Sequence, residues 1–161
     1  MTVSNLVKSM IGALLLSVTG AVFAEGEGSA IIPRWMKHPA GASHLQITNI
    51  TDVQVDVVVR LYDQNGNTYD NTVHGAITCD PWMACNVNQP AMTMVIPPHG
   101  TGQFYVNNSV GGGAWYGYGK ISWSYSGAED TPKPNQALIA NGYYYTTNGR
   151  AEFPINNWQP F

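Results

Sequence analysis

The chain has 161 residues, of which only 11% are charged, and seven Lys and Arg residues stand against ten Asp and Glu residues. This acidic balance excludes a nucleic-acid-binding surface of the usual kind, because such a surface needs a basic patch that neutralises phosphates. The length corresponds to a single domain.

The first 24 residues have the three-part pattern of a secretory signal peptide. Lys8 supplies a short positive region, residues 10–18 are apolar and rich in leucine, and residues 22–24 place small side chains where cleavage usually occurs. The apolar part is shorter than the about 20 residues that a membrane-spanning helix needs. We therefore expect cleavage after Ala24, one domain over residues 25–161, no membrane insertion of the mature chain, and a secreted or periplasmic location.

The clearest alternation in the chain lies in residues 53–63. Apolar side chains occupy every second position, at Val53, Val55, Val57, Val59 and Leu61. Successive side chains of a strand point to opposite faces, and β-branched valines favour that backbone, so this segment is predicted to be a half-buried strand. Asn65-Gly66 then favours a tight hairpin turn, from which the chain is expected to return as a strand over residues 68–77.

Shorter alternating segments predict further strands on both sides of this hairpin. They cover residues 30–37, 44–50, 91–96, 101–107, 114–126 and 137–147. Pro33 marks the first of them as an edge strand, and residues 97–100 are a strong turn signal. About seven to nine short strands without helical periodicity predict an all-β, antiparallel two-sheet sandwich, with an eight-stranded barrel as the alternative.

Cys79 and Cys85 are predicted to form a disulfide, the expected state in an exported protein. The closed loop of seven residues corresponds to about 2–2.5 kcal/mol of chain entropy, so we expect the bridge to shape a local loop rather than to hold the fold. The spacing fits neither a zinc site nor a redox pair, which has two intervening residues.

Three segments resemble parts of small uncharacterised secreted bacterial proteins. They are residues 45–50 with the following valine strand and its hairpin at residues 62–66, the corner at residues 96–100 (Ile-Pro-Pro-His-Gly), and the ending at residues 153–161 (Phe-Pro-Ile-Asn-Asn-Trp-Gln-Pro-Phe). The first two are similar to immunoglobulin-like domains of surface proteins. The resemblance implies an immunoglobulin-like β-sandwich and no particular activity, because a shared fold does not transfer function.

Patterns for metal binding are weak. Oxygen-bearing side chains that calcium favours occur around the predicted hairpin, at Asp63, Asn65, Asn67 and Asp70. The glycine of this loop is not at the EF-hand position, so a polar hairpin tip is the favoured interpretation. The four histidines, His38, His44, His74 and His99, show no ligand spacing, and we expect no metal and no cofactor.

Patterns for catalysis are equally weak. The chain has no Gly-x-Ser-x-Gly elbow. A glycosidase needs two facing carboxylates, for which the candidates are Asp56, Asp80, Glu129, Asp130 and Glu152. We expect a protein that is not an enzyme, with a small secreted hydrolase as the least favoured alternative.

Aromatic residues are the best indication of function. The candidate binding surface consists of Trp82 in the disulfide loop together with Trp115, Tyr116, Tyr118 and Tyr144. Trp35 and Trp123 are instead expected in the core. Exposed rings bind sugars by stacking and bind proteins as hot spots.

The sequence thus predicts a non-catalytic exported protein that acts by protein–protein contact, as a surface, matrix or adhesion component. The alternative is a carbohydrate-binding module that uses the exposed Trp and Tyr rings. Expected partners are a protein or a polysaccharide at the cell surface. Self-association through a sheet edge is a further expectation, with residues 30–35 or 153–161 as the added strand.

Overall fold

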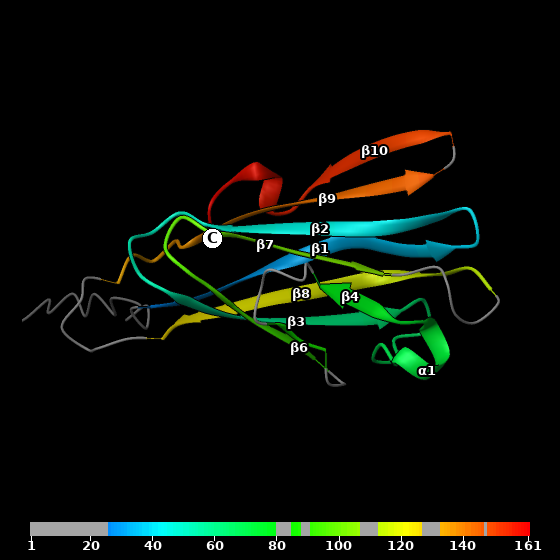
Figure 1. Ribbon diagram of the computed structural model, residues 1–161, viewed down its shortest axis with the longest axis horizontal. Helices are drawn as coiled ribbons and strands as arrows, with labels where there is room; N and C mark the ends of the chain where they lie inside the picture. The colour runs from blue at the N-terminus through cyan, green and yellow to red at the C-terminus, as the bar shows by residue number, and fades with distance from the viewer. Residues whose placement is uncertain (1–25, 80–84, 88–90, 107–112, 127–132, 147) are drawn as a thin grey trace, which may run out of the picture.

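The computed structural model describes residues 26–79, 85–87, 91–106, 113–126, 133–146 and 148–161. These residues form ten strands and two short helical turns (Figure 1). The strands are β1 (Glu27–His38), β2 (Gly41–Asn49), β3 (Val55–Asp63), β4 (Ile77–Cys79), β5 (Cys85–Asn86), β6 (Met92–Ile96), β7 (Thr101–Val106), β8 (Trp115–Tyr125), β9 (Leu138–Thr146) and β10 (Gly149–Pro154), and the turns are α1 (Asn71–His74) and η1 (Asn156–Trp158). The all-β prediction is confirmed, and the predicted signal peptide (residues 1–24) lies outside the described residues.

The strands pair in an antiparallel manner throughout the described part of the chain, in the order β10–β9–β2–β1–β8–β3–β6–β5, with β7 pairing with β2 and β4. One edge of β2 pairs with β9 along its whole length, and the other pairs with β7 at five positions but with β1 at only two. Two groups of strands result, β10–β9–β2–β7–β4 and β1–β8–β3–β6–β5. Among the described residues, the strand pairing between the two groups is the short β1–β2 hairpin, and the Asn49 side chain adds a hydrogen bond of 3.2 Å from β2 to the Ile96 carbonyl of β6.

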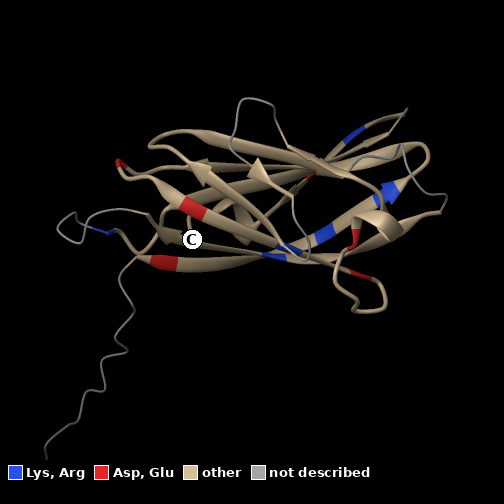
Figure 2. Cartoon of the chain, turned by 60° about the horizontal axis from the view of Figure 1, so that its bottom comes forward, with Lys and Arg blue, Asp and Glu red and all other residues tan. Residues whose placement is uncertain are grey.

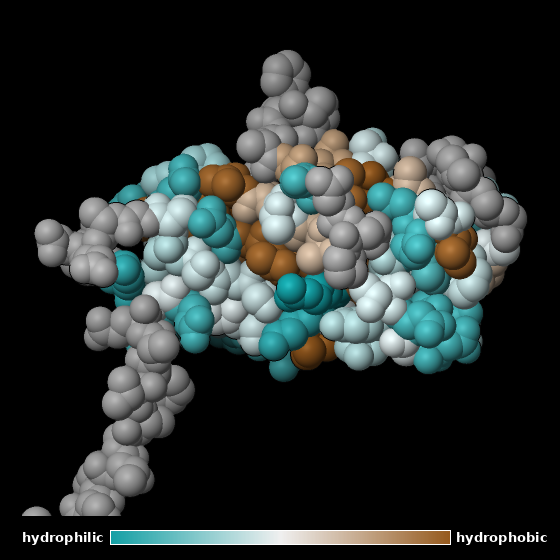
Figure 3. Space-filling model, turned by 90° about the horizontal axis from the view of Figure 1, so that it is seen from below, coloured by the Kyte–Doolittle hydropathy of each residue, from teal (hydrophilic) through white to brown (hydrophobic). Residues whose placement is uncertain are grey.

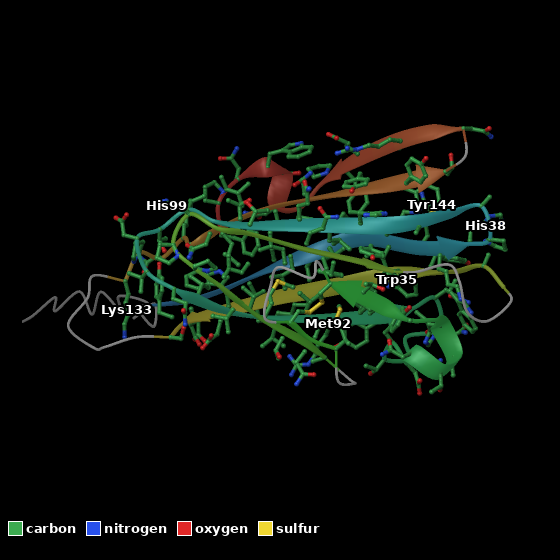
Figure 4. The ribbon with its side chains drawn as sticks, in the orientation of Figure 1. Trp35, His38, Met92, His99, Lys133 and Tyr144 are labelled. Carbon is green, nitrogen blue, oxygen red and sulfur yellow. A yellow bond between two sulfur atoms is a disulfide. The ribbon has the colours of Figure 1, made fainter. Side chains whose placement is uncertain are left out.

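The core lies between these groups and follows the predicted alternation. In β3, Val55, Val57, Val59 and Leu61 are all buried, while Val53 lies just before the strand and is half-buried. Trp35 and Trp123 are buried as predicted. Trp35 and Met92 are buried, whereas His38, at the end of β1, and His99, in a turn, lie at opposite ends of the molecule (Figure 4).

The predicted hairpin turn is present, but the predicted return strand over residues 68–77 is wrong. Gly66 has a positive φ of 82°, and Asp63 pairs with Asn67 across the turn. After a single bridge at Thr68, the carboxylate of Asp70 accepts the Thr72 N–H at 2.7 Å and caps the helical turn α1. This local cap competes with strand pairing, and it leaves Val73 48% exposed.

The two segments that were expected as added strands pair within their own chain. Residues 30–35 belong to β1, which pairs with β8. After β10, the tail folds back, so that the Phe161 N–H donates to the Leu138 carbonyl at 2.9 Å and Phe161 is buried. Neither segment is therefore available to a neighbouring molecule without opening the sheet.

Candidate functional site

The outward side of β1, β8 and β3 carries the exposed rings of Tyr116 and Tyr118, and we call it the contact face. Alternation along each strand sends one set of side chains into the core and the other set outward. The outward set is Glu27, Ser29 and Ile31 of β1, Tyr116, Tyr118, Lys120, Ser122 and Ser124 of β8, and Asp56, Val58, Arg60 and Tyr62 of β3.

The strand register arranges these side chains in rows across the face. The rows are Glu27–Ser124–Asp56, then Ser29–Ser122–Val58, then Ile31–Lys120–Arg60, and then Tyr118–Tyr62. The face therefore runs from an acidic row through a neutral row and a basic row to an aromatic row. Figure 2 shows the acidic bands toward the left end of the molecule and basic bands nearer the middle of the strands.

The aromatic end of the contact face holds three tyrosines. The rings of Tyr62 and Tyr118 stack, with centroids 5.0 Å apart and planes inclined by 18°. Tyr118 is 45% exposed and Tyr116 is 54% exposed, so their side of β8 meets solvent. Because the two stacked rings are nearly parallel, each covers one face of the other.

Trp35 supports the stacked tyrosines from inside the core. Its indole N–H donates to the carbonyl of Tyr62 at 2.8 Å and to that of Tyr118 at 3.1 Å. The side chain is completely buried and follows a register shift in β1 between Ile32 and Trp35, at the position of Pro33. Its two hydrogen bonds connect the shifted part of β1 to the backbones of β3 and β8 beneath the rings.

Two glycines in β8 permit this close approach. A Cβ on Gly117 would collide with the carbonyl oxygen of Tyr62, and a Cβ on Gly119 would lie 2.6 Å from Leu61 Cδ2 and 3.0 Å from Ile32 Cδ1. The missing side chains therefore leave room for large neighbouring side chains and for the backbone of β3. The aromatic row is consequently held on a tightly packed backbone.

The carboxylate of Asp63 organises the hairpin beside the contact face. Its Oδ1 accepts the N–H groups of Asn65 and Asn67, both at 2.8 Å, and its Oδ2 lies 3.1 Å from Asn67 Nδ2 and 3.2 Å from His74 Nε2. Burial raises the pKa of Asp63, but these hydrogen bonds to the ionised form outweigh it and lower the pKa to about 2. Stability from this carboxylate is therefore present above its ordinary pKa and lost as the pH falls toward 2.

The same contacts involve the weak calcium-ligand candidates of the hairpin, Asp63, Asn65, Asn67 and Asp70. The oxygens of Asp63 accept hydrogen bonds within the hairpin, and Asp70 caps α1. Within the described ranges, no group of three or more His, Cys, Asp or Glu residues is placed to hold a metal ion.

His74 is buried among three aromatic rings, and this cluster was not predicted from the sequence. Its ring lies 4.5 Å from Trp115, 4.9 Å from Tyr69 and 6.2 Å from Trp35, measured between centroids. Tyr69 donates its hydroxyl to the Gly75 carbonyl at 2.7 Å, and burial raises its pKa. Trp115 therefore packs at the margin of the core, on the opposite side of β8 from Tyr116 and Tyr118.

Two other candidate residues lie apart from the contact face. Tyr144 is half-buried in β9 and lines a groove of about 390 Å³ with Met36, Ser43 and Phe153 (Figure 4). Trp82 lies outside the described residues. Only Tyr116 and Tyr118 of the predicted surface are therefore brought together as exposed rings.

The contact face continues onto β6 through a shallow hollow. This hollow has a volume of about 550 Å³, and its lining includes Asp56, Val58, Thr93 and Val95. Seen from below, apolar side chains gather near the middle of the molecule, with hydrophilic ones around them (Figure 3). The exposed apolar area is thus limited and bordered by polar groups.

The opposite outer side, on β7, β2, β9 and β10, is different, and we call it the ladder face. The His44 ring stacks between Tyr105 and Tyr143, at 5.1 Å and 4.6 Å, and the guanidinium of Arg150 lies 3.8 Å from the Tyr143 ring centre. Next to this stack, a hydrogen bond of 3.0 Å joins Gln46 to Gln103 and another of 2.9 Å joins Thr48 to Thr101. Burial, and then the charge of Arg150, lower the pKa of His44, whose buried Nδ1 has no hydrogen-bond partner.

The predicted disulfide between Cys79 and Cys85 is present. It connects β4, the last strand of one group, to β5, the last strand of the other. The bridge therefore closes the side of the molecule opposite the β1–β2 hairpin, a position that the short loop between the cysteines did not reveal.

Comparison with models of known protein families matched none of them, and comparison with curated protein sequences found no match. The helical turns in the described part of the chain are too short and too polar to cross a membrane. The geometry of the contact face is consequently the main guide to function.

Proposed function

We propose that this protein is an exported, non-catalytic, immunoglobulin-like β-sandwich that acts by binding another protein at the cell surface through the contact face. The division of the strands into two groups, each with a buried inner side, supports the sandwich over a closed barrel. The disulfide and the signal-like first 24 residues support export.

The observation that carries the proposal is a pair of exposed tyrosines next to an exposed arginine on a rigid sheet. Tyr116 and Tyr118 are about half exposed, and Arg60 lies in the neighbouring row. Tyr and Arg are enriched among the residues that dominate protein interfaces. Because Trp35 and the glycines fix the backbone beneath the rings, binding would order few additional backbone groups, and this part of the entropy cost of association would be small.

Carbohydrate binding is the alternative, and the exposed ring of Tyr116 favours it to a limited degree. A sugar stacks on the flat face of an aromatic ring. In the Tyr62–Tyr118 pair, each ring already covers one face of the other. The rings therefore stand against one another rather than forming a flat platform, which supports a protein partner more than a polysaccharide.

The proposal is tested with isolated cell envelopes of the source organism and the labelled protein. We expect saturable binding that protease treatment of the envelopes removes and polysaccharide-degrading enzymes leave intact. The double variant Tyr116→Ser/Tyr118→Ser should bind at least about tenfold more weakly, as expected for hot-spot residues. The matched control is Tyr145→Ser, since Tyr145 is 56% exposed but lies on β9.

Two results would count against the proposal. Binding that resists protease but disappears after polysaccharide digestion would favour the carbohydrate alternative, in which case Trp82→Ala is the next variant to examine. Equal binding by the Tyr116→Ser/Tyr118→Ser variant and by the control would show that the contact face is not used.

A further inference from the structure

We propose that the contact face binds a second copy of this chain, arranged so that the basic row of each copy lies over the acidic row of the other. The inference rests on the proposed function, because it names the partner of the same surface. The order of charges along the strands makes the contact face of one copy complementary to that of a second copy in one orientation only.

The basic row is unfavourable in an isolated molecule. Arg60 and Lys120 occupy directly opposed positions on β3 and β8, and both are exposed. Like charges at opposed positions of neighbouring strands repel each other. The ion pairs among the described residues are His74–Asp63, His99–Asp52 and Arg150–Glu152, so neither Arg60 nor Lys120 takes part in one.

The acidic row lies at a fixed distance from the basic row on the same face. Asp56 precedes Arg60 by four residues on β3, which corresponds to about 13 Å along a strand. Glu27 precedes Ile31 by four residues on β1, and Lys120 precedes Ser124 by four on β8. The two charged rows are thus parallel, and the row of Ser29, Ser122 and Val58 lies midway between them.

A two-fold axis along this middle row, running across the strands, relates the two charged rows to each other. When two copies meet face to face about that axis, Arg60 of each copy lies over Asp56 of the other, and Lys120 lies over Ser124, beside Glu27. Each contact then occurs twice, as in isologous dimers. A parallel arrangement would instead place like charges over like charges, so the electrostatics favour a single orientation.

The same operation gives the aromatic row a polar partner. Beyond the acidic row lie Gln54 and Ser126, which are joined by a hydrogen bond of 2.9 Å. In the paired arrangement, Tyr62 and Tyr118 of one copy reach this Gln54–Ser126 pair of the other. A shallow hollow of about 280 Å³, lined by Glu27, Ser29, Lys120 and Ser122, leaves room for interfacial groups at the centre.

The test is sedimentation equilibrium of the purified protein over a concentration series, at low and high salt. We expect a monomer–dimer equilibrium that high salt weakens, because exposed charge pairs are screened. Arg60→Glu/Lys120→Glu makes the face acidic throughout and should weaken dimerisation at least about tenfold, or 1.4 kcal/mol. Glu27→Lys/Asp56→Lys makes the face basic throughout and should do the same.

Two further mixtures make the test specific. The two double variants should pair with each other when mixed, and the quadruple variant that exchanges both rows should regain the dimer of the original protein. Asp52→Lys is the matched charge reversal away from the face, since the Asp52 side chain is 95% exposed in a turn. It should leave dimerisation unchanged, and thermal unfolding shows that each variant is folded.

A protein that remains monomeric up to about 1 mM overturns the inference, as does a dimer that both charge reversals leave intact. If the monomeric protein still binds envelopes through Tyr116 and Tyr118, the proposed function stands with a different partner. If envelope binding is also independent of these tyrosines, both proposals fail.

Discussion

The two outer sides of the molecule are both formed by antiparallel strands, but they differ in how their side chains pair across neighbouring strands. On the ladder face, His44, Tyr105 and Tyr143 stack, and Arg150 completes the stack at Tyr143. On the contact face, the corresponding cross-strand positions hold two cations side by side and the stacked pair Tyr62–Tyr118, in which Tyr118 is 45% exposed. The ladder face thus places its cation against a ring, whereas the contact face sets two cations against each other.

This difference shows how a sheet separates stability from recognition. Favourable cross-strand pairs each contribute about 0.2–1 kcal/mol, and a face built from them supports the fold. A face with fewer such pairs gains less stability from them but keeps more of its charged groups available for binding. The comparison predicts that substitutions on the two faces will have different effects, and the largest effect is expected from the core residue beneath the contact face.

Removal of Trp35 should have the largest effect. Trp35→Ala creates a cavity and leaves the carbonyls of Tyr62 and Tyr118 without the indole N–H, so we expect a loss of about 3–5 kcal/mol in the free energy of unfolding. Trp35→Phe keeps a ring and should lose less. Urea denaturation measures both, and a loss below about 1 kcal/mol for Trp35→Ala would show that the indole does not support the face.

Removal of one tyrosine from each face should separate the faces directly. Tyr143→Ala breaks the stack with His44 and the contact with Arg150, for an expected loss of about 1–2 kcal/mol. Tyr116→Ala should change stability by no more than about 0.5 kcal/mol, as for a simple surface position. Equal losses in urea denaturation would contradict the distinction between the faces.

The ladder face should also respond to mild acid. Because the pKa of His44 is lowered in the folded state, the unfolded chain binds more protons below the ordinary histidine pKa of about 6.5. The contribution of His44 is therefore fully present above that pH and decreases as the pH falls through it. His44→Phe keeps a ring in the stack and should reduce the difference between melting temperatures at pH 7.5 and pH 5; an unchanged difference would argue against this role.

The smallest effect is expected from Lys120→Glu in the monomer. The substitution replaces a like-charge pair with an opposite-charge pair beside Arg60, which should stabilise the fold by up to about 0.5 kcal/mol. Thermal unfolding at a concentration well below that of self-association measures it. A destabilised monomer would mean that Lys120 already has a favourable role within the chain.

Much of the sheet could be predicted because its signals are local. The alternation of Val55, Val57 and Val59 places one side of β3 in the core whatever its neighbours are, and the Asn65-Gly66 turn has its own backbone preference. The region after the turn failed because Asp70 offers a side-chain cap, a choice that alternation does not detect. For Tyr116 and Tyr118, the polar residues Lys120, Ser122 and Ser124 on the same side of β8 are a local signal of exposure.

The remaining features of the site depend on contacts between distant positions. Trp35 lies 27 residues from Tyr62 and 83 from Tyr118, and no spacing rule relates an indole to carbonyls so far away. The charged rows likewise exist only because β1, β8 and β3 have one particular register. Asp63 and His74 were each visible in the sequence, but their contact follows from the unexpected helical turn.

The sulfur bridge has a consequence for how firmly its two short strands are held. Strands β4 and β5 are attached by only three and two residue pairs, and the bond between Cys79 and Cys85 fastens them to each other. In a reducing compartment the two cysteines would stay unbonded, and β4 and β5 would be held only by their few strand pairs. In an oxidising compartment, formation of the disulfide would fasten the two strand ends to each other.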